Sequence, residues 1–133
     1  IDVLEEMFKL LGKGDYVMGG PKHNEHGIAE VAKQLEERTN EGALFCIMGF
    51  CEDKEFDKML ALMPPYAHYI FTKASIRRAA SLDKIAEVAE ALDRDYEVVP
   101  TVAEALARAK ELLLEDDMLF IGGSTFVVAE AIG

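Results

Sequence analysis

The spacing of hydrophobic positions along this chain switches repeatedly between the pattern of a strand and the pattern of a helix, which predicts strands and helices in alternation. Five short runs are apolar on both faces or rich in β-branched and aromatic residues, as buried strands are. The predicted strands are Tyr16–Gly19, Ala43–Gly49, Ala67–Thr72, Tyr96–Val99 and Met118–Gly122. The last of these runs is apolar throughout, which is typical of a central parallel strand covered by helices on both sides.

Helical stripes, with apolar residues three and four positions apart, lie between the strands. They are Ile28–Leu35, Phe56–Met63, Ile85–Leu92 and Val102–Leu113, and a last helix follows Ser124. Thr101 stands before the fourth stripe with Glu104 three residues on, the spacing of a capping box. The alternation predicts an α/β fold: a mainly parallel five-stranded sheet in a three-layer domain, with helices on both faces. No repeat or long linker interrupts it, so residues 1–133 are expected to form a single domain.

Composition narrows the range of possible partners and locations. The chain has 133 residues and 50% hydrophobic content, enough for one compact core. Its 25 acidic and 14 basic residues give a net charge of −11, which argues against a nucleic-acid partner because such surfaces are basic. No apolar run approaches the roughly 20 residues of a membrane helix, and the first residues carry acids where a signal peptide is basic. We therefore expect a cytoplasmic protein without a membrane partner.

Glycine-rich and polar segments follow four of the predicted strands. Ligands in parallel α/β sheets bind outside the carboxyl ends of the strands, so these segments are expected to meet at the ligand edge. They are Gly19–Gly27, Gly49–Lys54, Thr72–Ala79 and Gly122–Thr125. In the last segment two glycines permit a tight turn, and Ser124 is placed to cap a helix whose free N–H groups suit a carboxylate or phosphate. A plain capped turn explains the same residues.

The first two segments offer polar candidates. His23, Asn24 and His26 could donate to or stack on a ligand. Their HxxH spacing suggests zinc, but no carboxylate or thiol stands at a matching helical position, so no metal ligands are assigned. Lys54 suits a substrate carboxylate, or is a solvated surface charge.

The third segment carries the basic cluster Lys73, Arg77 and Arg78, which suits an anion or a solvated helix start. His68 is interpreted as an ordinary strand-edge residue. Cys46 and Cys51 have no CxxC spacing and are expected to be reduced thiols. No Ser-His-Asp arrangement and no GxxxxGK[ST] phosphate loop occurs, so no catalytic residue is assigned.

Together, these segments resemble the C-terminal domain of folylpolyglutamate synthase/dihydrofolate synthase, in the Mur ligase superfamily. The similar stretches are GGPKHNEHGIAEVAKQL, CIMGFCEDKEFDKML, YIFTKASIRRA and LFIGGSTFVVAEAI, in this order. The resemblance implies a Rossmann-like domain whose last strand lies next to the first and the second. It also implies an ATPase domain earlier in the same polypeptide, which uses ATP and Mg²⁺ to make the acyl phosphate that glutamate attacks. The C-terminal domain helps hold glutamate and closes over the nucleotide.

Carried over by this resemblance, His23 and Asn24 face the nucleotide, and Lys54 and Ser124 lie near the incoming glutamate. Gly20 departs from the family, because an acidic residue that reaches the nucleotide ribose normally stands there. Glu25 stands where proline often follows the His-Asn pair. The departure at Gly20 weakens the expected nucleotide contact.

Two functions from different classes follow. One is an accessory substrate domain of an ATP-dependent amide ligase, inactive alone and without a cofactor of its own because the phosphate loop is absent. The other is a scaffold of this fold without activity, natural or engineered, since the Ala-, Glu-, Lys- and Leu-rich helices suit both origins. A weaker idea is a stand-alone anion binder that uses the TKASIRR and GGST loops. Any ligand recognition that the isolated chain retains is expected to be for a small carboxylate or phosphate at Ser124, helped by Lys54 and bound weakly against the net negative charge.

Overall fold

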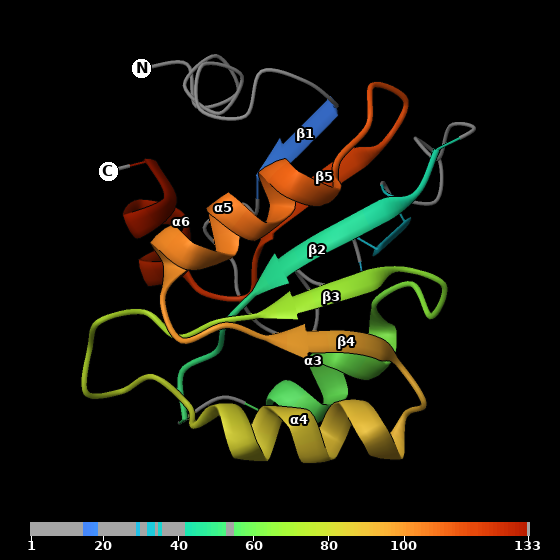
Figure 1. Cartoon of the computed structure of the whole chain (residues 1–133). Coiled ribbons are helices and arrows are strands. Elements are labelled where there is room, and N and C mark those ends of the chain that lie inside the picture. The colour runs from blue at the N-terminus through green and yellow to red at the C-terminus, as the bar shows by residue number, and fades with distance from the viewer. Residues whose placement is uncertain are drawn as a thin grey trace.

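From residue 44 onward, strands and helices alternate along the described chain (Figure 1). The structure is a computed structural model and describes residues 15–18, 29, 32, 33, 35, 42–52 and 55–132. Its elements are β1 (Asp15–Met18), β2 (Leu44–Met48), α3 (Phe56–Leu62), β3 (His68–Phe71), α4 (Leu82–Ala91), β4 (Asp95–Val98), α5 (Val102–Leu112), β5 (Met118–Gly122) and α6 (Thr125–Ile132). Each strand lies within one residue of the ends predicted from the hydrophobic pattern.

The strands form one sheet in the order β1-β5-β2-β3-β4, and every neighbouring pair is parallel. β5 is an interior strand that pairs with β1 on one side and β2 on the other. This is the position that the family resemblance implied and that the two-sided apolar run of β5 favoured. The α/β class and the parallel sheet are therefore confirmed.

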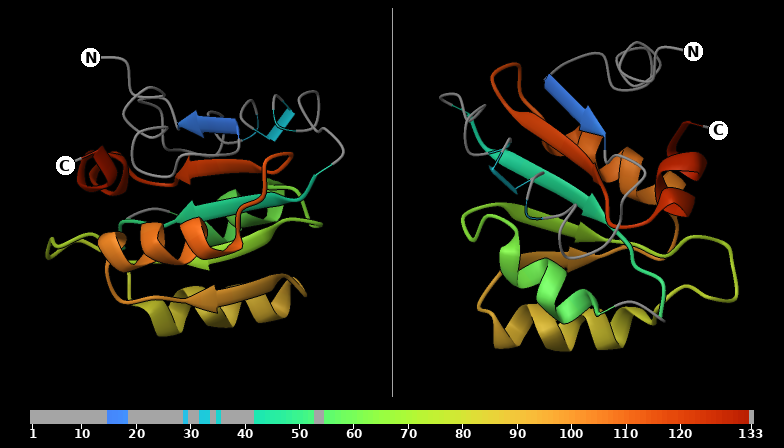
Figure 2. Two further views of the ribbon diagram at one scale, coloured as in Figure 1. Left: turned by 45° about the horizontal axis from the view of Figure 1, so that its top comes forward. Right: turned by 180° about the vertical axis from the view of Figure 1, so that it is seen from behind.

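Helices cover both faces of the sheet and enclose two separate cores (Figure 2). Successive side chains of a strand point to opposite faces, so every buried strand contributes to both cores. Cys46 and Phe120 pack on the face covered by α3 and α4, whereas Ile47 and Ile121 pack on the face covered by α5 and α6. Full burial of an aliphatic or aromatic side chain contributes about 1.5–3 kcal/mol, which explains why β2 and β5 contain no polar residue.

Side-chain oxygens satisfy the first N–H groups of two helices. Thr101 Oγ1 accepts from the N–H of Glu104 at 3.2 Å, as the capping-box spacing predicted. Ser81 Oγ accepts from the N–H of Lys84 at 3.2 Å in the same way. At its far end α4 turns out of the helix at Asp93, whose φ of 57° lies in the left-handed region.

A buried aspartate holds the start of β5 against the start of β2. Asp117 Oδ1 accepts from the N–H of Ala43 at 2.8 Å, and Oδ2 accepts from the N–H of Leu114 at 2.8 Å. The residue is 6% exposed. One carboxylate therefore closes the turn after α5 and also fixes where β2 begins.

The predicted helix Ile28–Leu35 falls mostly outside the described residues. Its described members Ala32 and Leu35 are buried in the core shared with α3 and α4, as the apolar stripe requires. None of the helices that the structure describes is both long and apolar enough to cross a membrane.

Candidate functional site

Three of the four predicted segments meet at the carboxyl edge of the sheet, the edge where β2, β3 and β5 end. Glu52 donates its N–H to the carbonyl of Arg78 at 2.7 Å, and Ala80 donates to the carbonyl of Phe50 at 2.7 Å. The N–H of Gly49 lies 3.4 Å from the carbonyl of Gly122. These backbone bonds join the loops after β2, β3 and β5 into one surface.

The turn between β5 and α6 is built around a glycine with a left-handed backbone. Gly123 has φ +88°, and a Cβ at this position would lie 2.6 Å from the carbonyl oxygen of Gly49. Both the backbone conformation and the close approach of the neighbouring loop therefore require glycine. The tight turn predicted from the paired glycines is present.

Ser124 caps α6, as predicted. Its Oγ accepts from the N–H of Phe126 at 3.1 Å, and its carbonyl accepts from the N–H of Val128 at 3.3 Å. Its residue surface is only 4% exposed, and its hydroxyl lies 3.7 Å from the Sγ of Cys51. The hydroxyl is already engaged within the fold, so an anion at this helix start would be bound mainly by backbone N–H groups.

The basic cluster lies on the loop after β3, at the same edge of the sheet. Lys73, Arg77 and Arg78 are exposed. The loop is fixed to α6 by Ser75, whose N–H and hydroxyl donate to the carboxylate of Glu130 at 2.6 and 3.2 Å. The basic loop and the Ser124 turn are thus anchored to the same helix.

Several predicted site residues lie outside the described residues. They are His23, Asn24, His26, Lys54 and the departure Gly20. Their ligand roles stay predictions, as does the ligand role of Ser124. Within the described part of the chain, no three His, Cys, Asp or Glu side chains are grouped so as to hold a metal ion.

The two cysteines are free thiols in buried positions. Burial raises the pKa of the Cys46 thiol well above its usual range, so this residue behaves as an inert core side chain. Cys51 lies at the carboxyl edge beside Ser124.

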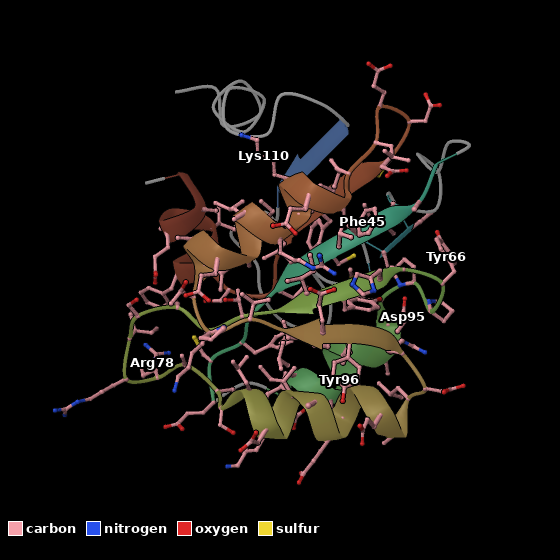
Figure 3. The ribbon with its side chains drawn as sticks, viewed as in Figure 1. Phe45, Tyr66, Arg78, Asp95, Tyr96 and Lys110 are labelled. Carbon is pink, nitrogen blue, oxygen red and sulfur yellow. The ribbon has the colours of Figure 1, made fainter. Side chains whose placement is uncertain are left out.

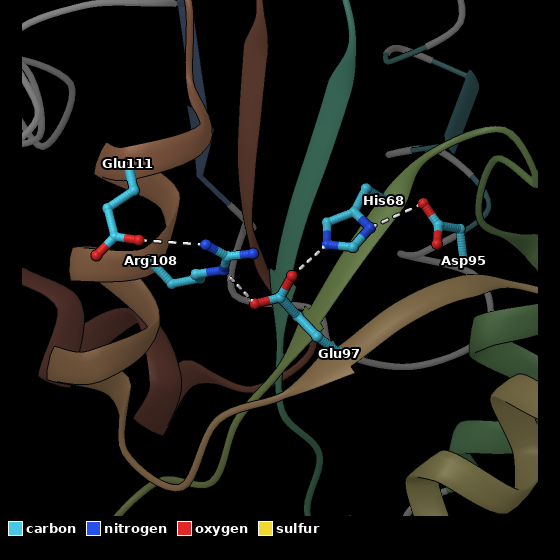
Figure 4. Close-up of polar contacts among 5 residues, drawn as sticks. All are labelled: His68, Asp95, Glu97, Arg108 and Glu111. Atoms are coloured by element: carbon cyan, nitrogen blue, oxygen red, sulfur yellow. Dashed lines mark hydrogen bonds and ion pairs between the residues drawn. The ribbon is translucent and has the colours of Figure 1, made fainter.

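A second polar cluster, which sequence reasoning missed, lies at the amino ends of β3 and β4, opposite the carboxyl edge (Figure 4). His68 Nδ1 lies 2.9 Å from Asp95 Oδ2, and Nε2 lies 2.8 Å from Glu97 Oε2. Arg108 reaches from α5 and donates from Nε to Glu97 Oε1 at 2.6 Å and from Nη1 to Glu111 at 3.2 Å. His68 is therefore more than the ordinary strand-edge residue that the sequence suggested.

Electrostatics hold Glu97 in its charged form. Partial burial raises the pKa of Glu97, but hydrogen bonds from Arg108 and His68 outweigh this effect, so the pKa lies below its usual value. The same contacts tie β3, β4 and α5 together. The sequence offers one indication of this polar cluster: Asp95 and Glu97 stand two positions apart, on one face of a strand.

Comparison with known proteins identifies a family. The sequence matches the family described as "Mur ligase, glutamate ligase domain" over residues 22–125. It is 32% identical over 125 residues to the "Probable bifunctional folylpolyglutamate synthase/dihydropteroate synthase" of Haloferax volcanii. That match covers 93% of this chain and 15% of the relative, so the chain spans a small part of the relative's length.

Solved structures share the fold. E. coli FolC in complex with DHPP and ADP superposes with a TM-score of 0.73 at 20% identity, over 84% of this chain and 26% of that chain. The bifunctional folylpolyglutamate synthase/dihydrofolate synthase of Yersinia pestis, complexed with AMPPNP and Mn ion, gives a TM-score of 0.71 at 21% identity, over 84% and 26% of the two chains.

Proposed function

Because the chain belongs to the glutamate ligase domain family of the Mur ligases, we propose that it is the domain of an ATP-dependent folate–glutamate ligase that holds glutamate and closes over the nucleotide. The observation that carries this proposal is the capped turn at Gly123 and Ser124, at the edge where three loops meet. A helix start with free N–H groups is a ready binding place for a carboxylate.

Each residue has a proposed part. The N–H groups at this helix start that the Ser124 hydroxyl does not engage bind the glutamate carboxylate, with Lys54 as the paired cation. His23 and Asn24 face the nucleotide, although Gly20 removes one expected contact to its ribose. The relatives solved with ADP, or with AMPPNP and Mn ion, support nucleotide and metal use in the complete enzyme.

The ATPase chemistry belongs to another domain of the same polypeptide. Phosphoryl transfer depends on positioned phosphate donors and Mg²⁺, and this sequence contains no phosphate loop. The isolated chain is therefore expected neither to hydrolyse ATP nor to join glutamate to a folate. Phosphate release by the purified chain, at a rate unchanged by repurification, would contradict this expectation.

Titration of the labelled chain with glutamate and with inorganic phosphate tests the anion site. We expect the backbone amide signals of Gly122–Thr125 to shift, with Kd in the millimolar range, which corresponds to about −4 kcal/mol. Lys54→Ala should weaken the shifts, whereas Lys84→Ala, the same charge change on an exposed position of α4, should not.

The alternative function is a scaffold without retained activity. It predicts that the Gly122–Thr125 amides stay still at tens of millimolar ligand. It also predicts that Lys54→Ala and Lys84→Ala behave alike. Either result would overturn the glutamate-binding proposal for this chain.

A further inference from the structure

The amino ends of β2, β3 and β4 border a pocket at the sheet edge opposite the Ser124 turn. It has a volume of about 380 Å³, which is within the range of small-molecule sites. Its lining includes two aromatic residues, a histidine and three charged residues: Phe45, Tyr66, His68, Asp95, Glu97 and Arg108. Figure 3 shows Phe45, Tyr66 and Asp95 towards this end of the sheet, and Arg78 at the other end. We call this feature the amino-edge pocket.

Strand pairing explains why these side chains converge. His68 lies directly opposite Asp95 in the β3–β4 register, and Glu97 is two residues further along β4. Tyr96, between the two acids, packs with the core on the α4 face, so Asp95 and Glu97 point to the α5 face. Phe45 belongs to the core on that same face and meets the His68 ring edge-on at 5.8 Å.

The hydrogen bonds of the cluster leave an acceptor oxygen of Asp95 open towards the pocket. Both carboxylate oxygens of Glu97 are engaged, one by His68 and one by Arg108. Asp95 uses Oδ2 for His68, whereas its Oδ1 has no hydrogen-bond partner within the part of the chain that the structure describes. The Asp95 side chain is 79% exposed, so a ligand can reach this oxygen.

The charge of the pocket favours a cation. Asp95, Glu97 and the adjoining Glu111 supply three carboxylates, against the guanidinium of Arg108 and the imidazole of His68. Arg108 is occupied by Glu97 and Glu111, so it is poorly placed to bind an external anion through its fork. The whole chain, with a net charge of −11, also concentrates cations near its surface.

We propose that the amino-edge pocket binds a small organic cation: an ammonium group on an aromatic or aliphatic body. The ammonium donates to Oδ1 of Asp95, and the apolar body packs against Phe45 and Tyr66, whose rings also attract a cation. This site is separate from the proposed glutamate site at the carboxyl edge. It does not depend on the proposed ligase function.

Matched probes of similar size and different charge test the proposal. The isotope-labelled chain is titrated with 2-phenylethylamine, with 2-phenylethanol and with 3-phenylpropanoate while the backbone amide signals are followed. We expect the amine to shift the amides of Leu44–Phe45, His68 and Asp95–Glu97, with weaker shifts from the alcohol and the weakest from the carboxylate. Affinity in the millimolar range is expected for an open, partly exposed site.

Two charge-matched variants complete the design. Asp95→Asn should weaken amine binding about fivefold, the size of effect expected from loss of an exposed ion pair, and should leave binding of the alcohol unchanged. Glu87→Gln, the same charge change on α4 at the other face of the sheet, should leave amine binding unchanged. Far-UV circular dichroism confirms that both variants are folded.

Three results would overturn the proposal. One is the absence of shifts in the pocket amides at tens of millimolar amine. Another is equal binding of the carboxylate and the amine, which would remove the charge preference. The last is an equal loss in Asp95→Asn and Glu87→Gln, which would indicate general attraction to an acidic protein. None of these results bears on glutamate binding at the Ser124 turn.

Discussion

Replacement of Asp117 is expected to lower the stability of the fold, because its carboxylate joins two segments of backbone. Its two carboxylate oxygens accept from the N–H groups of Ala43 and Leu114, each at 2.8 Å. Asp117→Ala removes both acceptors and leaves two backbone donors at a junction where the side chain is almost fully enclosed.

The expected loss in free energy of unfolding follows from the two N–H groups that Asp117→Ala leaves without an acceptor. An unsatisfied buried N–H costs about 1–3 kcal/mol. The lower half of that range applies because both hydrogen bonds are only partly buried and both donor residues, Ala43 and Leu114, are exposed. We therefore expect Asp117→Ala to lower the free energy of unfolding by about 2–4 kcal/mol. For a domain of this size that corresponds to a fall in Tm of roughly 10 °C. Asp117→Asn keeps one oxygen acceptor and should lose about half as much.

Urea unfolding followed by far-UV circular dichroism measures these differences. Asp116→Ala is the matched control, because this neighbouring aspartate is exposed and should change stability by no more than about 0.5 kcal/mol. The reasoning fails if Asp117→Ala is no more destabilising than Asp116→Ala. It also fails if Asp117→Asn is as destabilising as Asp117→Ala, because the argument assigns a share to each oxygen.

Three further predictions concern backbone conformation and charge. Gly123→Ala should cost about 2–4 kcal/mol in urea unfolding, since alanine at φ +88° is strained and its Cβ would meet the carbonyl of Gly49; a loss below about 0.5 kcal/mol would contradict this. Asp93→Gly should stabilise the chain by up to about 1 kcal/mol, because φ 57° favours glycine at the end of a helix; destabilisation would argue against the left-handed turn. The pKa of Glu97 is lowered in the folded state, so its stabilising contribution is present above the ordinary pKa of a glutamate and disappears as the pH falls through the lower folded value. Glu97→Gln should therefore flatten the decline of stability on acidification, and parallel pH profiles for the two chains would refute the lowered pKa.

Much of the fold can be predicted from local pattern. The apolar run of β5 indicates burial on both faces of the strand. This predicts an interior position in the sheet even when the neighbouring strands are not known. Likewise, the capping roles of Thr101 and Ser124 depend only on residues two or three positions away. Information of this kind is contained in short windows of sequence.

The amino-edge pocket could not be predicted in this way. His68 meets Asp95 and Glu97 across 27 and 29 positions, and the meeting depends on the register of β3 against β4. A shift of one residue would send both acids to the other face of the sheet. The apolar alternation that identifies a strand fixes the face that each side chain takes, but it does not distinguish registers two residues apart, so it does not place Asp95 opposite His68.

β4 also bears on how this protein avoids associating with other copies of itself. It is an edge strand of four residues, and β3 is its one pairing partner among the strands that the structure describes. An unpaired strand edge is a template on which another sheet can grow. Short length and charged side chains are the usual protection against such growth. Asp95 and Glu97 supply that charge, so the acids that shape the pocket also keep this edge of the sheet from recruiting a neighbour.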